Sequence, residues 1–137
     1  MKSQYQDLIK AAREAQARAH APFSKFRVGA AILDTHDRIH SGFNIESSSY
    51  GLTMCAERVA IFGAMASGMS NFKAMALVSD DPGFTPPCGA CRQVVFDLAG
   101  DIDFIMVNAK GRTKILKMKS LLPHSFSSEN LTHNVNH

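Results

Sequence analysis

The chain has 137 residues, a length typical of one compact domain, and its 45% of hydrophobic residues can build a core of useful size. Its net charge of +3 is only mildly basic, and no stretch reaches the roughly 18 consecutive apolar residues of a membrane span, so we expect neither a nucleic-acid nor a membrane partner. The charged N-terminal stretch lacks the apolar region of a signal peptide, which favours a cytoplasmic protein.

Hydrophobic periodicity and turn residues divide the chain into alternating helices and strands. In chain order, we expect a helix over 4–19, strands over 26–33 and 39–45, a helix after residue 53 to about 66, a strand over 73–79, a helix over 88–98, strands over 104–108 and 113–118, and a helical turn at 120–122. Ser3 and Gln6 form a capping box for the first helix, and Pro22 lies beyond its end. Gly68 and Gly100 close the two later helices.

This order of elements predicts an α/β fold. The turn at 110–112 is so short that the last two strands must be antiparallel. We expect a three-layer α-β-α arrangement, in which a mixed five-stranded sheet is covered by helices on both faces. The prediction is a single domain over residues 1–137, with a loose polar tail over about 132–137.

Three cysteines lie in two short motifs. Cys55 stands near the predicted start of the second helix, and Cys88 and Cys91 form a C-x-x-C at the start of the third. Residues three apart share one face of a helix, and the positive end of a helix favours thiolates. An odd number of cysteines argues against a disulfide framework. Three thiolates at helix N-termini instead predict a zinc site, with the fourth position open as in catalytic zinc sites.

Glu57 follows Cys55 by two residues and need not be a ligand. Side chains at i and i+2 do not share a helix face, so both can address one metal only beyond the N-terminal end of the helix. A glutamate there can move a proton between a zinc-bound water and a substrate. Because zinc with three thiolates carries a net negative charge, we expect Arg58 and Arg92 to offset it by hydrogen-bonding the sulfurs.

The combination C-x-E and P-C-x-x-C is typical of zinc-dependent nucleoside and nucleobase deaminases. A lone C-x-x-C would leave a redox pair or a structural zinc open. Over nearly its whole length the chain resembles the small, homotetrameric zinc-dependent cytidine deaminases of the cytidine/deoxycytidylate deaminase superfamily. The stretches that carry the resemblance are APFSKFRVGAA, GFNIESSSYG, MCAERVAIF, PPCGACRQV and LLPHSF.

The resemblance implies roles for individual residues. One zinc per subunit would be bound by Cys55, Cys88 and Cys91, and Glu57 would be the proton shuttle. The implied substrate-binding residues are Phe26, Asn44, Glu46, Ser48, Tyr50, Ala56 and Phe126.

Among these, Asn44 and Glu46 would hydrogen-bond the ribose 3′-hydroxyl, and Phe26 would pack against the pyrimidine. The backbone near Ala56 would contact the base. Phe126, together with Ser48 and Tyr50, would reach the site of a neighbouring subunit, as a homotetramer allows.

The implied reaction is the hydrolytic deamination of cytidine and 2′-deoxycytidine to uridine and 2′-deoxyuridine plus ammonia, as in pyrimidine salvage. A zinc hydroxide would attack pyrimidine C4 while Glu57 moves the protons. Three alternatives stay open: deamination of modified aminopyrimidine nucleosides (N4-substituted cytidines or blasticidin S), editing of a polynucleotide, and a structural zinc module that binds a partner. Ser47 and Phe23 depart from the family's common Asn and Tyr, which could alter tolerance at C4.

Overall fold

The computed structural model describes the backbone of residues 1–135 and the side chains of residues 1–131. Its elements in chain order are α1 (Ser3–Gln16), β1 (Val28–Asp34), β2 (Ile39–Phe43), the 3-10 helix η1 (Tyr50–Leu52), α2 (Ala56–Ala66), β3 (Phe72–Ser79), α3 (Gly89–Ala99), β4 (Asp103–Val107), β5 (Thr113–Lys117), α4 (Met118–Leu121) and α5 (Ser128–Val135). None of the helices described is long and apolar enough to cross a membrane.

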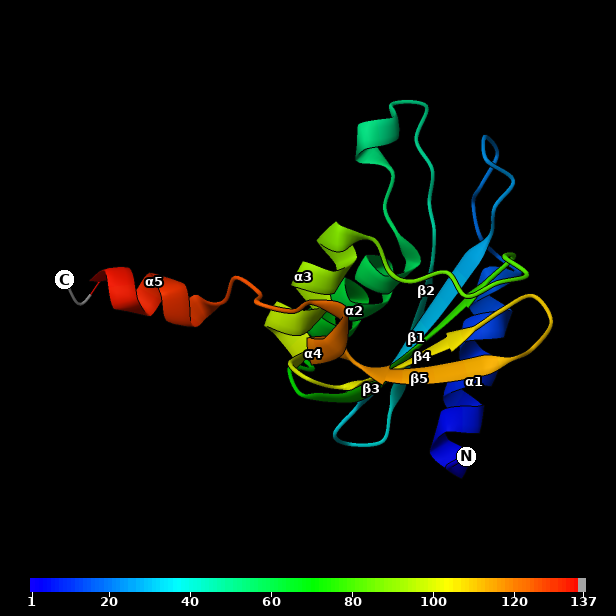
Figure 1. Ribbon diagram of the computed structural model, residues 1–137. Helices are drawn as coiled ribbons and strands as arrows, with labels where there is room; N and C mark the ends of the chain where they lie inside the picture. Colours follow the sequence, from blue (N-terminus) through cyan, green and yellow to red (C-terminus); the bar gives the residue numbers. More distant parts are fainter. Residues whose placement is uncertain (136–137) are drawn as a thin grey trace.

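The five strands form one mixed sheet in the order β2-β1-β3-β4-β5. Strands β3 and β4 are parallel, and every other neighbouring pair is antiparallel, including β4 and β5. Helix α1 covers one face of the sheet, while α2 and α3 cover the other (Figure 1). The predicted five-stranded α/β fold, with helices on both faces and antiparallel last strands, is therefore confirmed.

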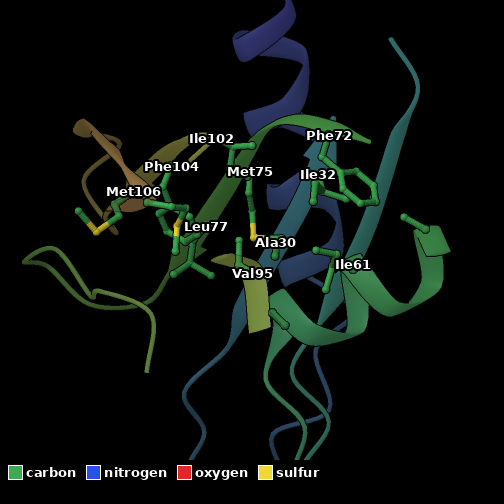
Figure 2. Packing of buried hydrophobic residues seen from close by; sticks show 14 of the residues in the cluster. Ala30, Ile32, Ile61, Phe72, Met75, Leu77, Val95, Ile102, Phe104 and Met106 are labelled. Carbon is green, nitrogen blue, oxygen red and sulfur yellow. The ribbon is translucent and has the colours of Figure 1, made fainter. Parts of the chain in front are cut away.

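Alternating side chains of the central strands supply a separate core for each face. In β1, Ala30 and Ile32 pack toward α2 and α3, whereas Ala31 and Leu33 pack toward α1. Figure 2 shows the first of these two cores, in which Phe104 from β4 joins the cluster. This is the period of two that a strand imposes on a sheet covered on both sides.

Helix α2 lies unusually close to edge strand β2, and Gly42 makes this possible. A Cβ atom at Gly42 would stand 2.5 Å from the backbone nitrogen of Ala60 and 3.0 Å from the carbonyl oxygen of Ala56. Real Cβ atoms do not approach backbone so closely, so only glycine fits here. The contact sets the height of the first turn of α2 above the sheet.

Several predicted boundaries differ from the structure because side-chain and loop contacts compete with regular pairing. Helix α1 ends at Gln16, three residues early, and the backbone of His20 then pairs with Asn44 and Glu46. Strand β1 begins at Val28, two residues late. Helix α5 was not predicted, and it projects away from the rest of the chain (Figure 1).

Helix α5 continues through Val135 and so includes the first four residues of the tail over 132–137, whose looseness stays a prediction. An acidic residue, Glu129, lies in the first turn of this polar helix, where it complements the helix dipole. The last two residues of the predicted tail lie outside the described residues.

Candidate metal and catalytic site

The two helices that carry the cysteines point their N-termini at one place. Cys55 is the N-cap of α2, Cys88 is the N-cap of α3, and Cys91 lies in the first turn of α3. Their three sulfur atoms all lie within 4.8 Å of one another, and the Sγ atoms of Cys55 and Cys88 are 3.8 Å apart. Tetrahedral zinc with Zn–S bonds near 2.3 Å separates its sulfurs by about 3.8 Å. All three thiols are free, so the donor set fits one zinc ion.

Electrostatics already favour the thiolate form at Cys55. Hydrogen bonding from Cys91, followed by that from Arg58, lowers the pKa of the Cys55 thiol to about 5, although burial opposes this. The same hydrogen bond to Cys55, together with burial, raises the pKa of Cys91. A lowered thiol pKa is characteristic of cysteines that bind metals.

Arg58 takes the position that the sequence predicts. Its Nη2 donates a hydrogen bond of 3.5 Å to Cys55 Sγ, and this bond is the main reason for the raised pKa of the guanidinium. Its Nε is buried and makes no hydrogen bond to any described residue. The cation therefore faces the sulfur cluster, where it offsets negative charge.

The predicted contact of Arg92 with a sulfur is not what the structure shows. Arg92 donates from Nε to the Pro87 carbonyl oxygen at 2.7 Å and from Nη1 to the Leu121 carbonyl oxygen at 2.9 Å. Two of its five N–H donors bind these two backbone acceptors, which sets the direction of the guanidinium group. Arg92 thus holds the loop that enters α3 against α4, next to Cys88, instead of bonding a thiolate.

Glu57 lies beside the cysteines in a cavity of about 200 Å³. Its side chain is buried, with 4% exposure, and burial, reinforced by the charge at Cys55, raises its pKa to about 7. Ala56 is fully buried and lines the same cavity. The cavity therefore joins a metal-binding cluster to a carboxyl group that can hold or release a proton near neutral pH.

Five residues that the sequence interpretation missed also line this cavity: Val28 from β1, Leu77 from β3, and Thr53, Thr85 and Pro86 from loops. Three of them could have been predicted from their position in the sequence next to the cysteine motifs. Thr85 and Pro86 directly precede the P-C-x-x-C motif, and Thr53 lies two residues before Cys55, so the chain has to pass close to the metal ligands at these points. Leu77 comes from the buried strand β3 and carried no such signal.

Asn44 and Glu46 lie in two adjoining hollows. Asn44 lines the cysteine cavity, whereas Glu46 lines a neighbouring hollow with Phe23, Ser24 and Tyr50. Thr53 lines both hollows, so they lie next to each other.

Each of these two polar side chains already has partners within the chain. Asn44 Nδ2 donates to the Phe26 carbonyl oxygen at 2.9 Å, and Asn44 Oδ1 accepts from the Val28 N–H at 3.0 Å. The carboxylate of Glu46 accepts from the N–H groups of Phe23 and Ser24 and from the Ser24 hydroxyl. The bond from the Ser24 side chain is the main cause of the lowered pKa of Glu46. An amide and a carboxylate each keep lone pairs for a further donor.

The remaining predicted substrate residues do not line the cavity that holds Cys55 and Cys88. Phe26 is half-buried at the entry to β1, and Ser48 is exposed. Tyr50 is 75% exposed and meets Phe23 edge to face with the ring centroids 6.1 Å apart. Phe126 is 57% exposed, and its carbonyl oxygen accepts from Gln93 Nε2.

Comparison with known proteins gives consistent matches. Residues 2–107 match the family described as the cytidine and deoxycytidylate deaminase zinc-binding region. A cytidine deaminase from Sporosarcina psychrophila is 43% identical over 127 residues, covering 92% of this chain and 93% of the relative. The crystal structure of a cytidine deaminase from Burkholderia pseudomallei superposes with a TM-score of 0.87 at 40% identity, covering 92% of this chain and all of the other. A more distant match, a blasticidin-S deaminase from Bacillus cereus, is 30% identical over 76% of this chain and 79% of its own length.

Proposed function

The chain belongs to the cytidine and deoxycytidylate deaminase family, and we propose that it catalyses the hydrolysis of cytidine and 2′-deoxycytidine to uridine and 2′-deoxyuridine plus ammonia. The observation that carries this proposal is the single cavity that is lined both by Cys55 and Cys88 of the three-sulfur cluster and by the buried Glu57. Hydrolysis at C4 of a pyrimidine requires an activated water and a group that moves protons, and these residues supply the means for both.

Cys55, Cys88 and Cys91 would hold one zinc ion, which supplies a Lewis acid that lowers the pKa of a water molecule. Glu57 accepts the proton of that water and delivers it to ring N3, which makes C4 more electrophilic, so that the remaining hydroxide adds to C4. Glu57 then takes the proton of the added hydroxyl group and passes it to the amino group, and the C4–N bond breaks to release ammonia and leave the C4 carbonyl group. Since the Glu57 side chain is buried and shielded from bulk water, the transferred proton stays with the reactants.

The side chains around this centre divide the substrate between them. Phe26 packs against the pyrimidine, and the backbone near Ala56 contacts the base. Asn44 and Glu46 take the ribose 3′-hydroxyl with the lone pairs that their present hydrogen bonds leave free. The base would lie in the cysteine cavity, and the sugar would lie toward the neighbouring hollow that Glu46 lines.

The test is the substitution Glu57→Gln, assayed on cytidine and 2′-deoxycytidine with the zinc content measured on the same sample. We expect zinc to stay bound and kcat to fall by about 10²–10⁴-fold, the usual contribution of a general acid-base group. Glu129→Gln, a change at an exposed glutamate of α5, is the matched control and should retain full activity. Near wild-type activity of Glu57→Gln would refute the assignment, and absence of nucleoside deamination by the wild-type chain would refute the function.

Deamination of modified aminopyrimidine nucleosides is the second candidate, favoured by the similarity to a blasticidin-S deaminase. The two candidate functions can be distinguished by measuring kcat/KM for cytidine, 2′-deoxycytidine, N4-substituted cytidines and blasticidin S. A kcat/KM for blasticidin S above that for cytidine would support the second candidate. We expect the reverse order, because Asn44 and Glu46 are suited to a ribose.

We further propose that four chains assemble and complete one another's sites. Three large apolar side chains, Tyr50, Leu52 and Phe126, are 75%, 73% and 57% exposed in the isolated chain, which is costly unless a partner covers them. Tyr50 and Phe126 are also the residues that would reach a neighbouring site. The mass in solution should be near four times 14.9 kDa. A monomer that stays active at high dilution would contradict the assembly.

The three free thiols also indicate the cellular compartment in which the protein works. Because Cys55, Cys88 and Cys91 must stay reduced to bind zinc, we place the enzyme in the reducing environment of the cytoplasm.

A further inference from the structure

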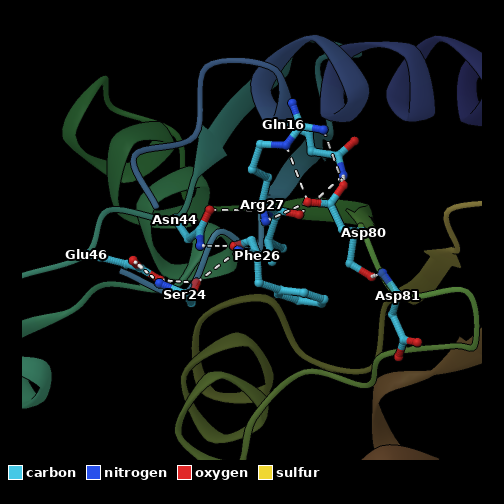
Figure 3. A network of polar contacts seen from close by, with 10 residues as sticks. Gln16, Ser24, Phe26, Arg27, Asn44, Glu46, Asp80 and Asp81 are labelled. Carbon is cyan, nitrogen blue, oxygen red and sulfur yellow. Dashed lines mark hydrogen bonds and ion pairs between the residues drawn. The ribbon is translucent and has the colours of Figure 1, made fainter. Parts of the chain in front are cut away.

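Just before β1, two consecutive peptide groups are held by side chains instead of by a neighbouring strand (Figure 3). They are the peptide group between Phe26 and Arg27 and the one between Arg27 and Val28. Asn44 binds both: its Nδ2 donates to the carbonyl oxygen of Phe26 at 2.9 Å, and its Oδ1 accepts from the N–H of Val28 at 3.0 Å. The other end of each peptide group belongs to Arg27, the residue between them. The direction in which this segment presents its side chains therefore depends on what holds Arg27.

Asp80, which follows β3, holds the backbone of Arg27 from the other side. Its Oδ2 accepts the Arg27 N–H at 2.9 Å, and its Oδ1 accepts from Gln16 Nε2 at 3.2 Å. Gln16 Nε2 lies 3.2 Å from the Arg27 carbonyl oxygen as well, so α1 closes the arrangement. Three elements that are remote in sequence thus meet at one residue.

The backbone contact matters more than the ion pair in this cluster. Asp80 also receives Arg27 Nε at 3.3 Å and Nη2 at 3.4 Å, but the Arg27 side chain is 52% exposed and that of Asp80 is 31% exposed. Ion pairs this exposed contribute little. A carboxylate that accepts from a backbone N–H is a charge-assisted bond with a fixed geometry, and it acts on the main chain directly.

We call these hydrogen bonds from Asn44, Asp80 and Gln16 the clamp, and they determine how the side chains of residues 26–28 are directed. Figure 3 shows the ring of Phe26 and the side chain of Arg27 leaving the backbone in opposite directions. Val28, at the other end of the segment, lines the cavity that contains Cys55 and Glu57. A rotation of the peptide groups at Arg27 would therefore turn the Phe26 ring and shift the wall at Val28.

We propose that Asp80 is a positioning residue for substrate binding, which acts through the backbone of Arg27 to fix the direction of the Phe26 ring. The proposal rests on the proposed function, in which Phe26 packs against the pyrimidine. Asp80 lines neither of the two hollows, and its effect is exerted through the segment that it holds.

Removal of the carboxylate in Asp80→Ala should raise KM for cytidine by about tenfold, the typical loss of one base–aromatic contact, and leave kcat within about threefold. The ring contacts the substrate and the transition state alike, so its misalignment weakens uniform binding and appears in KM. Asp80→Asn keeps the shape and one acceptor oxygen, and its effect on KM should be intermediate.

Asp103→Asn is the matched control. Asp103 also accepts a hydrogen bond from a neutral donor, Tyr5, and forms an ion pair, with Lys117, at a comparable exposure of 24%. Asp103 is the first residue of β4 and pairs with Ala74 near the start of β3, whereas Asp80 follows the end of β3. This variant should lower the melting temperature and leave KM unchanged, which separates a general loss of stability from a loss of positioning.

A double-mutant cycle with Phe26→Ala tests the route of the effect. If Asp80 acts through the ring, Asp80→Ala adds no further increase in KM once the ring is gone. An equal increase in both backgrounds would overturn the proposal, as would an unchanged KM in a folded Asp80→Ala variant.

Hydrogen exchange gives a readout that does not depend on activity. The Val28 N–H is bonded to Asn44 and not to Asp80, so faster exchange at Val28 in Asp80→Ala reports release of the whole segment. We expect at least a tenfold acceleration, with no change in Asp103→Asn. Unchanged exchange at Val28 refutes the clamp even if the wild-type chain deaminates cytidine, and accelerated exchange in a chain without that activity supports the clamp and refutes only the proposed function.

Discussion

The close approach of α2 to β2 can be tested by adding one methyl group, in Gly42→Ala. The new Cβ would stand 2.5 Å from the Ala60 nitrogen. Since carbon and nitrogen pack at about 3.5 Å, the helix has to move away from the strand by roughly 1 Å. The adjoining Ala56 carbonyl oxygen, at 3.0 Å, blocks a sideways escape.

Overpacking of this kind costs about 1–3 kcal/mol. An unfolding entropy of about 2.1 cal/mol/K per residue implies that a loss of 2 kcal/mol lowers the melting temperature of a 137-residue chain by about 7 °C. The first turn of α2 follows Cys55 and includes Glu57, whereas Cys88 and Cys91 are on α3. The same displacement should therefore separate the ligands, reducing zinc affinity and lowering kcat by up to about 10²-fold.

The assay combines thermal unfolding, zinc content and steady-state deamination on Gly42→Ala and on Gly63→Ala. Gly63 lies on the same helix with no atom within 4 Å of an added Cβ. The identical chemical change there should stabilise the helix by about 0.5–1 kcal/mol and leave the zinc content unchanged. A Gly42→Ala variant with wild-type melting temperature and zinc content would show that the packing of α2 on β2 does not set the position of the site.

Two further substitutions probe the charges. Arg58→Ala removes the guanidinium that donates to Cys55 Sγ, so we expect zinc affinity to fall by about 10–100-fold. The affinity can be measured by competition with a chelator, and an unchanged affinity would mean that the cation does not stabilise the bound metal. At the far end of β1, burial acts to raise the pKa of Asp34, but hydrogen bonds from His40 and from two backbone N–H groups outweigh it and lower the pKa from 3.8 to about 2. Its stabilising contribution is therefore complete above about pH 4 and is lost as the pH falls toward 2, so the difference in urea stability between wild type and Asp34→Asn should shrink over that interval; a pH-independent difference would contradict it.

Local patterns in the sequence determined the element types, the five-stranded α/β fold and the donor set for zinc. Cys88 and Cys91 could be assigned to one helix turn because a spacing of three defines a common face, and Cys55 joined them through the C-x-E and P-C-x-x-C combination. Glu57 followed from the same motif. These assignments rest on spacings of a few residues, which chain geometry fixes before any tertiary contact forms.

Only the tertiary structure decided which partners the polar side chains take. The strand order β2-β1-β3 places Asn44 and Asp80 on either side of the residues before β1, and nothing in the chain around Asp80 predicts that contact. For the same reason Arg92 was expected at a sulfur and instead binds two backbone carbonyl groups, one of them 29 residues away. Hydrogen bonds between residues so distant in sequence depend on how the elements pack, because a side chain bonds to whichever donor or acceptor the folded chain brings within about 3 Å.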